Sequence, residues 1–353
     1  MKNNETLKLA RNYLGLSQTG LAKKIGVSQA VVSNIEKGNK PLTEDLIQKL
    51  KSVFSRSFFS VKNHGGNLNL HYRSSANISK KMIDLFESRV NILANNICEI
   101  LEYVDIPVNT IPTIGVEDFD YNAKELALYV RRYLGIGVNP IDEIVSLLER
   151  NGVIVYFYEF DFISSQNKNF DGVSFYVEDV PVILINKKIQ NARKVFTISH
   201  ELCHLIAHRN INRLIETERD LEKEANTFAS EFVIPTSEIK NEFYRLTLEK
   251  LFSLKAKWKL SVSALLYKGR SVGLTKDQYR RWVTRLSPYR KEEPFDVSMK
   301  SPVLLKKMIN VCKEELGGER EFLKTIGISE TIYNELYSTI EGEEYRSKLK
   351  IIL

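Results

Sequence analysis

The chain has 353 residues, a formal net charge of +7, and 43% hydrophobic and 27% charged residues. This composition excludes wholesale disorder and collagen-like repetition, and the length favours two or three domains over a single core. No apolar run reaches the roughly 18–20 residues that span a bilayer, and the first residues lack a secretory signal. The three cysteines, Cys98, Cys203 and Cys312, are too widely spaced for a disulfide framework or a four-thiolate zinc site. We therefore expect a cytoplasmic protein without membrane contact.

The excess positive charge is confined to the N-terminal sixth of the chain. Residues 1–62 contain 11 Lys or Arg and 4 Asp or Glu, whereas the remaining residues contain 40 of each kind. A compact basic unit attached to a neutral body indicates a module that binds a polyanion. A solvated basic face would give the same count, so charge alone leaves both interpretations open.

The pattern inside this basic segment predicts a helix-turn-helix. Apolar residues at helical spacing predict a first helix near residues 7–14. Two short helices, 18–25 and 29–37, follow, and each is preceded by a serine that can cap it and followed by a glycine that can end it. The apolar side chains expected to pack these two helices together are Leu21, Ala22, Ile25, Val27, Val32 and Ile35.

The outer face of the third helix carries residue types that read DNA in the major groove. Amides bind adenine edges, hydroxyls bind phosphates or bases, and small apolar groups contact the thymine methyl. These types occur at Gln29, Ala30, Ser33 and Asn34. Flanking lysines, among them Lys37, would neutralise phosphates and make binding fall as salt rises.

The stretch LSQTGLAKKIGVSQAVVSNIEKG resembles the XRE (phage-repressor-like) helix-turn-helix family. The resemblance implies a five-helix domain over residues 1–60 that binds an operator in double-stranded DNA, with Gln18, Gln29, Ser33 and Asn34 as DNA contacts. A structural copy of the fold that binds no DNA is the alternative. Such modules commonly read two half-sites as dimers, so a homodimer is one expected assembly.

Residues 63–115 are expected to connect this module to the rest of the chain. His64-Gly65-Gly66-Asn67 predicts a flexible break. A long helix is expected from about residue 79 to residue 103, with one apolar stripe. The stripe fits either a packing face against the next domain or a dimer seam, and the sequence does not choose between them.

A second unit, residues 116–240, has a mixed pattern. Two expected helices precede a buried strand, and two further strands joined by a short turn precede two more helices, so we predict a mainly helical α+β fold with a small sheet. The expected helices cover 123–134 and 140–150, and the expected strands cover 153–158, 173–177 and 182–186. Residues 241–353 read as a helical C-terminal domain without a chemical motif.

The helix expected over 191–208 contains the motif His200-Glu201-Leu202-Cys203-His204. Two histidines four residues apart project from one helical face about 6 Å apart along the axis, so both can bind one zinc ion. Glu201 lies beside them and can act as the general base. Three of the five histidines of the chain lie on this helix, which favours a metal site over a chance amphipathic pattern.

A third ligand is expected on the helix predicted over 216–233. Glu222 shares a face with Asn226, so Glu222 can complete a two-histidine, one-carboxylate site while Asn226 orients a ligand imidazole. Glu224 lies about 200° around the helix, where it faces solvent or a basic neighbour, and it stays the minor candidate. His208 lies two turns from His200 and is assigned a supporting role, with a direct catalytic role as the alternative.

FTISHELCHLIAH followed by EKEANTFASEFVIP resembles the two signature helices of the ImmA/IrrE family of zinc metallopeptidases. The resemblance implies a zincin-like fold with one Zn²⁺ per chain, His200, His204 and Glu222 as metal ligands, and Glu201 as the catalytic glutamate. Members fused to such a DNA module include regulators, stress-response proteins and mobile-element proteins that cleave a repressor or antitoxin-like partner. Cys203 stands where a glycine is usual, either as a metal-binding or redox-sensitive thiol or as a small buried hydrophobe.

The strands expected at 173–177 and 182–186 are the candidate sheet edges, along which a substrate segment would add in extended form. His208 or Tyr176 are the candidate donors to the oxyanion, and the alternative is that the strands only close the core.

The two motifs are compatible with three functions. The leading one is a DNA-associated zinc endopeptidase that removes a repressor or antitoxin-like regulator. The alternative is a DNA-binding repressor or antitoxin with a structural or sensory zinc site, and the third is a toxin-type protease held inactive by a partner.

Overall fold

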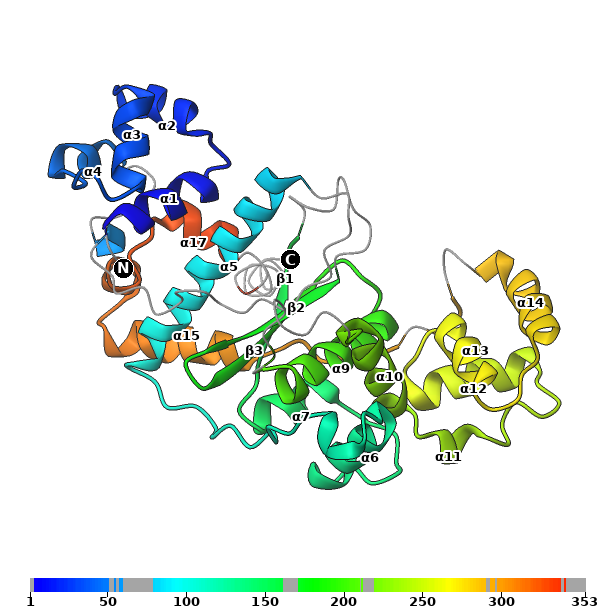
Figure 1. Ribbon diagram of the computed structural model, residues 1–353. Coiled ribbons are helices and arrows are strands. Elements are labelled where there is room, and N and C mark those ends of the chain that lie inside the picture. The colour runs from blue at the N-terminus through cyan, green and yellow to red at the C-terminus, as the bar shows by residue number, and fades with distance from the viewer. Residues whose placement is uncertain are drawn as a thin grey trace, which may run out of the picture.

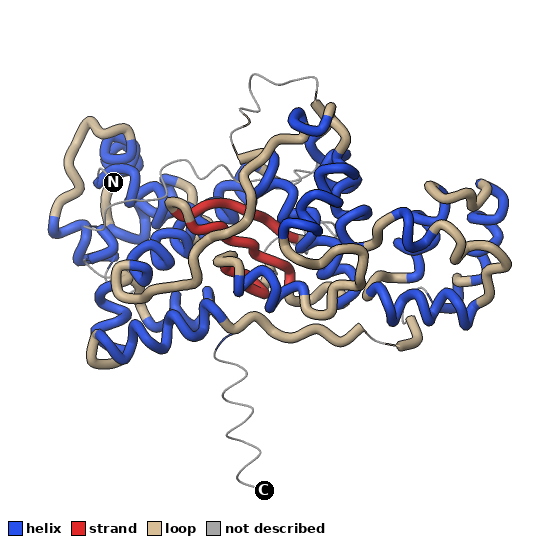
Figure 2. Tube along the Cα trace, turned by 90° about the horizontal axis from the view of Figure 1, so that it is seen from below, coloured by secondary structure: helices blue, strands red, loops and turns tan. Residues whose placement is uncertain are grey.

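The computed structural model of the chain describes residues 3–50, 54, 57–59, 79–160, 171–209, 211, 219–289, 293–295, 297–337 and 340. They form a mainly helical fold with one three-stranded sheet that lies between layers of helices (Figures 1 and 2). The predicted fold class is therefore confirmed. Within these residues, no helix is both long enough and apolar enough to cross a membrane.

The basic N-terminal segment folds as the sequence pattern predicts. Ser17 caps the second helix by accepting a hydrogen bond from the Gly20 amide, and Gly26 ends it at φ 67°, a left-handed conformation that costs glycine little. The third helix ends at Glu36, one residue before the predicted end. The helices are α1 (Asn3–Tyr13), α2 (Gln18–Ile25), α3 (Gln29–Glu36) and α4 (Glu44–Leu50), followed by the 3₁₀ turn η1 (Ser57–Phe59).

Two expectations for this part of the chain have a different outcome. The fifth helix implied by the family resemblance is absent from the described residues of this segment, which show only the turn η1 after α4. The predicted break at 64–67 lies outside the described residues.

The long helix α5 (Lys80–Leu101) joins the N-terminal helices to the rest of the molecule. Its apolar stripe, which includes Phe86, Val90 and Ile97, is buried in one core together with residues of α1 to α4. α5 contacts α1, strand β2 (Gly172–Val177) and a C-terminal helix, α15 (Leu304–Glu315). Of the two predicted uses of the stripe, the chain shows the packing face.

The sheet has the order β1-β3-β2, with β1 (Ile154–Tyr158) parallel to β3 (Val180–Asn186) and β2 antiparallel to it. β3 is therefore the central strand, and the prediction that residues 182–186 form an edge is wrong. Local pattern could not show this, because the partner that covers β3 comes from a strand more than twenty residues earlier. Within the described part of the chain, β2 is an edge strand, as predicted.

The sheet separates two hydrophobic cores. Along β3, Ile183 and Ile185 belong to the core shared with the helices that carry the histidines, whereas Val182 and Leu184 belong to the core shared with α1 to α5. This alternation follows from the two-residue period of a strand. The helices on the histidine side are α6 (Ala123–Tyr133), α7 (Ile144–Arg150), α9 (Asn191–Ala207) and α10 (Leu221–Val233), with the 3₁₀ turn η2 (Glu117–Phe119) before α6.

The segment predicted as one C-terminal helical domain contributes to both cores. Leu251, Leu254 and Leu265 pack in the core with α9 and α10, whereas Met308, Phe322 and Leu336 pack in the core with the N-terminal helices. Figure 1 shows α12, α13 and α14 at the opposite end of the molecule from α1 to α4. The C-terminal elements are α11 (Thr236–Ile239), α12 (Leu248–Trp258), α13 (Val262–Arg270), α14 (Lys276–Arg285), η3 (Ser287–Tyr289), α15, α16 (Glu319–Thr325) and α17 (Glu330–Leu336).

Candidate metal centre

Two neighbouring helices bring together the side chains of the candidate metal centre. α9 presents His200 and His204 on one face, and the first turn of α10 presents Glu222 to them. One donor atom from each of the three residues lies within 4.8 Å of the others. α10 can approach α9 closely because Ala225 and Ala229, both fully buried, are small.

The shortest distances between the donor atoms are close to those of a tetrahedral metal site. The two Nε2 atoms of His200 and His204 are 3.1 Å apart. One Glu222 oxygen, Oε2, lies 3.5 Å from His200 Nε2, and the other, Oε1, lies 3.6 Å from His204 Nε2. Ligands about 2.05 Å from a tetrahedral zinc ion are separated by about 3.3 Å. Two imidazoles and one carboxylate also form a donor set that suits zinc. These residues therefore fit the metal that the sequence predicts.

The electrostatics of the site favour a cation. Burial lowers the pKa of His200, but hydrogen bonding to Glu222 and the charge of Glu201 outweigh this effect and raise the pKa above its usual value. The carboxylates therefore create a negative potential at the imidazoles, and a bound divalent ion would satisfy it.

Each histidine has a hydrogen-bond partner at its second nitrogen. His200 Nδ1 lies 3.2 Å from Asn226 Oδ1, so the amide oxygen can accept the Nδ1 proton and leave Nε2 free to bind a metal. His204 Nδ1 lies 2.8 Å from His208 Nδ1, and His208 is fully buried. Asn226 and His208 thus each lie within hydrogen-bond distance of one of the two motif histidines.

A hydrogen-bonded chain runs from His204 to Glu224. If His204 Nε2 faces a metal, its Nδ1 carries the proton and donates to His208 Nδ1. His208 Nε2 must then carry a proton, and it lies 3.0 Å from Glu224 Oε2. Arg219 donates to both oxygens of Glu224. One tautomer is therefore imposed along the whole chain of groups.

Glu224 is held ionised at the end of this chain. Burial raises its pKa, but the hydrogen bonds from His208 and Arg219 lower it to about 2. Glu224 thus faces a basic neighbour, one of the two environments that the sequence predicts, and it lies apart from the Glu222 side of the helix. Arg219 lies only five residues before Glu224, but His208 reaches Glu224 through the packing of α9 on α10, so no local pattern indicates the link between His208 and Glu224.

Glu201 is almost completely buried and faces the sheet. Its Oε2 accepts a 2.7 Å hydrogen bond from Ser174 Oγ on β2, and Ser174 is fully buried. No motif in the sequence indicates this role of Ser174. The pattern that could have indicated it is a serine between two apolar strand residues, Val173 and Phe175. Side chains alternate along a strand, so Ser174 faces α9 while Val173 and Phe175 face the other core.

Two further predictions concern Tyr176 and Cys203. The Tyr176 hydroxyl donates to the Leu205 carbonyl, and the Arg209 guanidinium lies 4.0 Å from its ring centre, so Tyr176 holds β2 against α9. Cys203 is fully buried in the apolar core, and burial raises its pKa well above the usual value. Of the predicted alternatives for Cys203, the structure shows the small buried hydrophobe.

In the N-terminal module, the predicted DNA-contact residues surround a small polar network. Gln29 Nε2 donates to Gln18 Oε1, Gln18 Nε2 donates to Glu36, and Arg11 pairs with Glu36 at 2.5 Å. The Gln18 amide is therefore held in one orientation at the start of α2. The exposed predicted contacts are Gln29, Ala30 and Lys37, and the half-buried ones are Gln18, Ser33 and Asn34.

Comparisons with known families match two separate parts of the chain. Residues 7–59 match the family model described as helix-turn-helix, and residues 159–269 match the peptidase family M78 model described as the IrrE N-terminal-like domain. No curated protein and no solved structure matches the chain significantly. The chain therefore contains a helix-turn-helix DNA-binding domain and, after it, a metallopeptidase-like domain of the ImmA/IrrE type.

Proposed function

We propose that this protein is a DNA-binding regulator with zinc-dependent endopeptidase activity toward a repressor or antitoxin-like partner. The observation that carries the proposal is the convergence of His200, His204 and Glu222, with Glu201 beside them on α9. A purely structural zinc site has no use for an adjacent base and normally has four protein ligands. The family matches support both halves of the proposal.

In this proposal, His200, His204 and Glu222 hold the zinc ion, which when bound supplies Lewis-acid polarisation and acidifies water. Glu201 accepts a proton from the attacking water and delivers it to the leaving amine. The hydrogen bond from Ser174 orients the Glu201 carboxylate. His208 and Glu224 fix the ring and tautomer of His204, and Asn226 does the same for His200.

We further propose that the substrate segment adds to the edge of β2 that pairs with no other described strand. A two-residue loop joins Val177 to Val180, so these two residues form a hydrogen-bonded pair of the hairpin. Hydrogen-bonded pairs alternate along an antiparallel ladder, so the Phe175 amide also bonds to β3. The amides of Gly172, Ser174 and Tyr176 then point outward. A substrate peptide methylated at the amides that face β2 should lose cleavage, whereas methylation at the alternate amides should preserve it. Equal cleavage of both peptides would contradict edge docking.

The activity is tested by Glu201→Gln, which removes the base and preserves the size of the side chain. Comparison of N-terminal peptides from cells that produce the wild type or this variant should reveal a regulator cleaved only by the wild type. With purified proteins, we expect cleavage to fall by 10²–10⁴-fold while zinc content and operator binding stay unchanged. The product of a neighbouring gene is the first regulator to try.

The DNA-binding half is tested by gel retardation with the upstream region. Binding should weaken steeply as salt rises, because lysine contacts release counterions from phosphates. Gln29→Ala should weaken binding to the operator, whereas Gln48→Ala, an exposed amide on α4, should not. An operator affinity that changes neither on the Gln29→Ala substitution nor with salt concentration would contradict the proposal.

One observation favours a second candidate, a repressor or antitoxin with a sensory zinc site. Glu201 is only 4% exposed, and Ser174 already occupies one of its oxygens. The Glu201 carboxylate would then have to become exposed before it could accept a proton from water. An operator response to zinc that is the same in the wild type and Glu201→Gln, without any cleaved regulator, would support this candidate.

A further inference from the structure

A cavity of about 310 Å³ lies against the first turns of α9, away from the candidate metal centre. Its walls come from β1, the end of β3, α9, α15 and the segment that leads into α15. This volume falls at the lower end of the roughly 300–1,000 Å³ typical of small-molecule sites. Much of the lining is apolar, and it includes Phe157, Met299, Pro302 and Leu305.

Three lysines from three different elements line this cavity. They are Lys187 after β3, Lys194 on α9 and Lys306 on α15, and none of the described lining residues is acidic. The Lys194 ammonium is 3.1 Å from Asn191 Oδ1 and 4.8 Å from the centre of the Phe157 ring, and its side chain is nearly buried. Lys187 also lies 3.9 Å from Glu159, which is outside the cavity. The described residues that line the cavity therefore carry a net positive charge.

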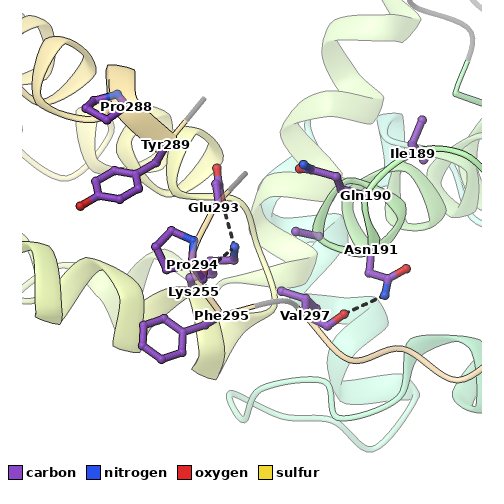
Figure 3. A pocket seen from close by; sticks show the side chains of 11 residues that line it. Ile189, Gln190, Asn191, Lys255, Pro288, Tyr289, Glu293, Pro294, Phe295 and Val297 are labelled. Carbon is purple, nitrogen blue, oxygen red and sulfur yellow. Dashed lines mark hydrogen bonds and ion pairs between the residues drawn. The ribbon is translucent and has the colours of Figure 1, made fainter. Parts of the chain in front are cut away.

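A larger neighbouring cavity, of about 800 Å³, shows the contrasting case (Figure 3). Its lysine, Lys255, pairs with Glu293 at 3.0 Å and donates to the Pro294 carbonyl, so its charge is balanced within the cavity wall. Asn191 lines both cavities and donates to the Val297 carbonyl. Among the described lining residues of the two cavities, only those of the smaller one include several lysines and no acidic residue.

We propose that the 310 Å³ cavity binds a small organic anion, an acidic group carried on an apolar body. Lys194 and Lys306 bind the acidic group, since ammonium groups form strong charge-assisted hydrogen bonds to carboxylate and phosphate oxygens. Phe157, Pro302 and Leu305 contact the apolar body. The site is independent of the proposed peptidase, because Lys194 lies six residues before His200, about 9 Å along the helix axis.

Isothermal titration of the full chain with phenyl phosphate tests the site. The wild type should bind one equivalent saturably and should bind inorganic phosphate more weakly, because phosphate lacks the apolar body. Lys306→Gln should weaken phenyl phosphate binding by roughly ten-fold, since it removes one charge-assisted contact. The matched variant Lys300→Gln changes an exposed lysine that does not line the cavity, and it should bind like the wild type.

Hydrogen exchange provides a second measurement if Lys306→Gln alters folding. Phenyl phosphate should slow exchange at residues 299–306 of the wild type. The proposal would be overturned if phenyl phosphate did not bind, if Lys306→Gln and Lys300→Gln bound it equally, or if protection appeared only at the zinc or DNA-binding residues. Equal affinity for inorganic phosphate would overturn the role given to the apolar wall.

Discussion

At the residue scale, the candidate centre depends on groups that do not touch the metal. The chain of hydrogen bonds from His204 through His208 to Glu224 requires each imidazole to hold its proton on one defined nitrogen. An ionised Glu224 sets that order, because it only accepts hydrogen bonds. Loss of its charge would let the His208 and His204 rings adopt tautomers that oppose metal binding.

Glu224→Gln should therefore lower zinc affinity by about 10–100-fold, the usual cost of removing such a supporting group. Competition with a chromophoric chelator measures this affinity. Lys223→Gln, an adjacent substitution on the exposed face of α10, is the matched control and should bind zinc like the wild type. Equal affinities in the two variants would show that Glu224 does not support the site.

The sequence predicted the metal centre on α9 because its residues repeat at helical spacing. His200, Glu201 and His204 can be assigned from the spacing within one helix. Ser174 could not be assigned to Glu201, because their contact depends on how α9 packs across β2. A contact between elements leaves no local periodic signal in either of them.

At the element scale, a buried ion pair fixes the end of α10 to α13. Lys268 on α13 donates to Glu231 at 2.6 Å, and the Thr236 amide and hydroxyl donate to the same carboxylate. Both charged side chains are 4% exposed. The pair therefore links α13 to the helix that carries Glu222.

Lys268→Met should destabilise the protein by about 3–5 kcal/mol, because it leaves the Glu231 charge buried without its cation. The double variant Glu231→Met with Lys268→Met should recover much of this loss. Thermal unfolding measures both effects, with the exposed Lys276→Met as control. A double variant less stable than Lys268→Met alone would contradict this account of the pair.

The same pair predicts a dependence of stability on pH. Burial raises the pKa of Glu231, but the bonds from Lys268 and Thr236 outweigh it and hold the pKa below the usual value. The stabilisation that the ionised Glu231 carboxylate contributes is therefore fully present above the unfolded pKa of about 4.3. It is lost as pH falls through the lower pKa that Glu231 has in the folded protein. The stability difference between the wild type and Glu231→Gln should narrow below about pH 4 in thermal unfolding measured across that range. A constant difference would exclude this linkage.

At the scale of the whole molecule, the DNA-binding helices are part of a core that reaches the sheet. The Tyr13 hydroxyl on α1 donates to Glu335 on α17 at 2.7 Å, although 322 residues separate them. Arg89 on α5 also pairs with Glu335 and lies over the Tyr13 ring. A movement of α17 would therefore disturb the contacts that hold α1 in place.

Glu335→Ala should loosen this junction, because it leaves the Tyr13 hydroxyl and the Arg89 guanidinium without their shared acceptor. The expected cost is roughly 1–3 kcal/mol, seen as faster hydrogen exchange in α1. The exposed Glu315→Ala should leave exchange in α1 unchanged. Unaltered exchange in the Glu335 variant would mean that apolar packing alone holds the module in place.

This junction also marks the limit of what the sequence could predict. The bounds of α2 followed from Ser17 and Gly26, which act on their own turns of the chain. The docking of α1 on α17, the central place of β3 and the contribution of 241–353 to two cores depend on tertiary packing. The residue types at those positions do not indicate which distant segment they contact.

The most direct test of the central claim is the zinc content of the purified, tag-free protein and its variants by elemental analysis. The account predicts one zinc ion per chain in the wild type and in Glu201→Gln, and its loss in Glu222→Ala. A wild-type protein without a transition metal, or a Glu222→Ala variant that retains zinc with unchanged affinity, would contradict it.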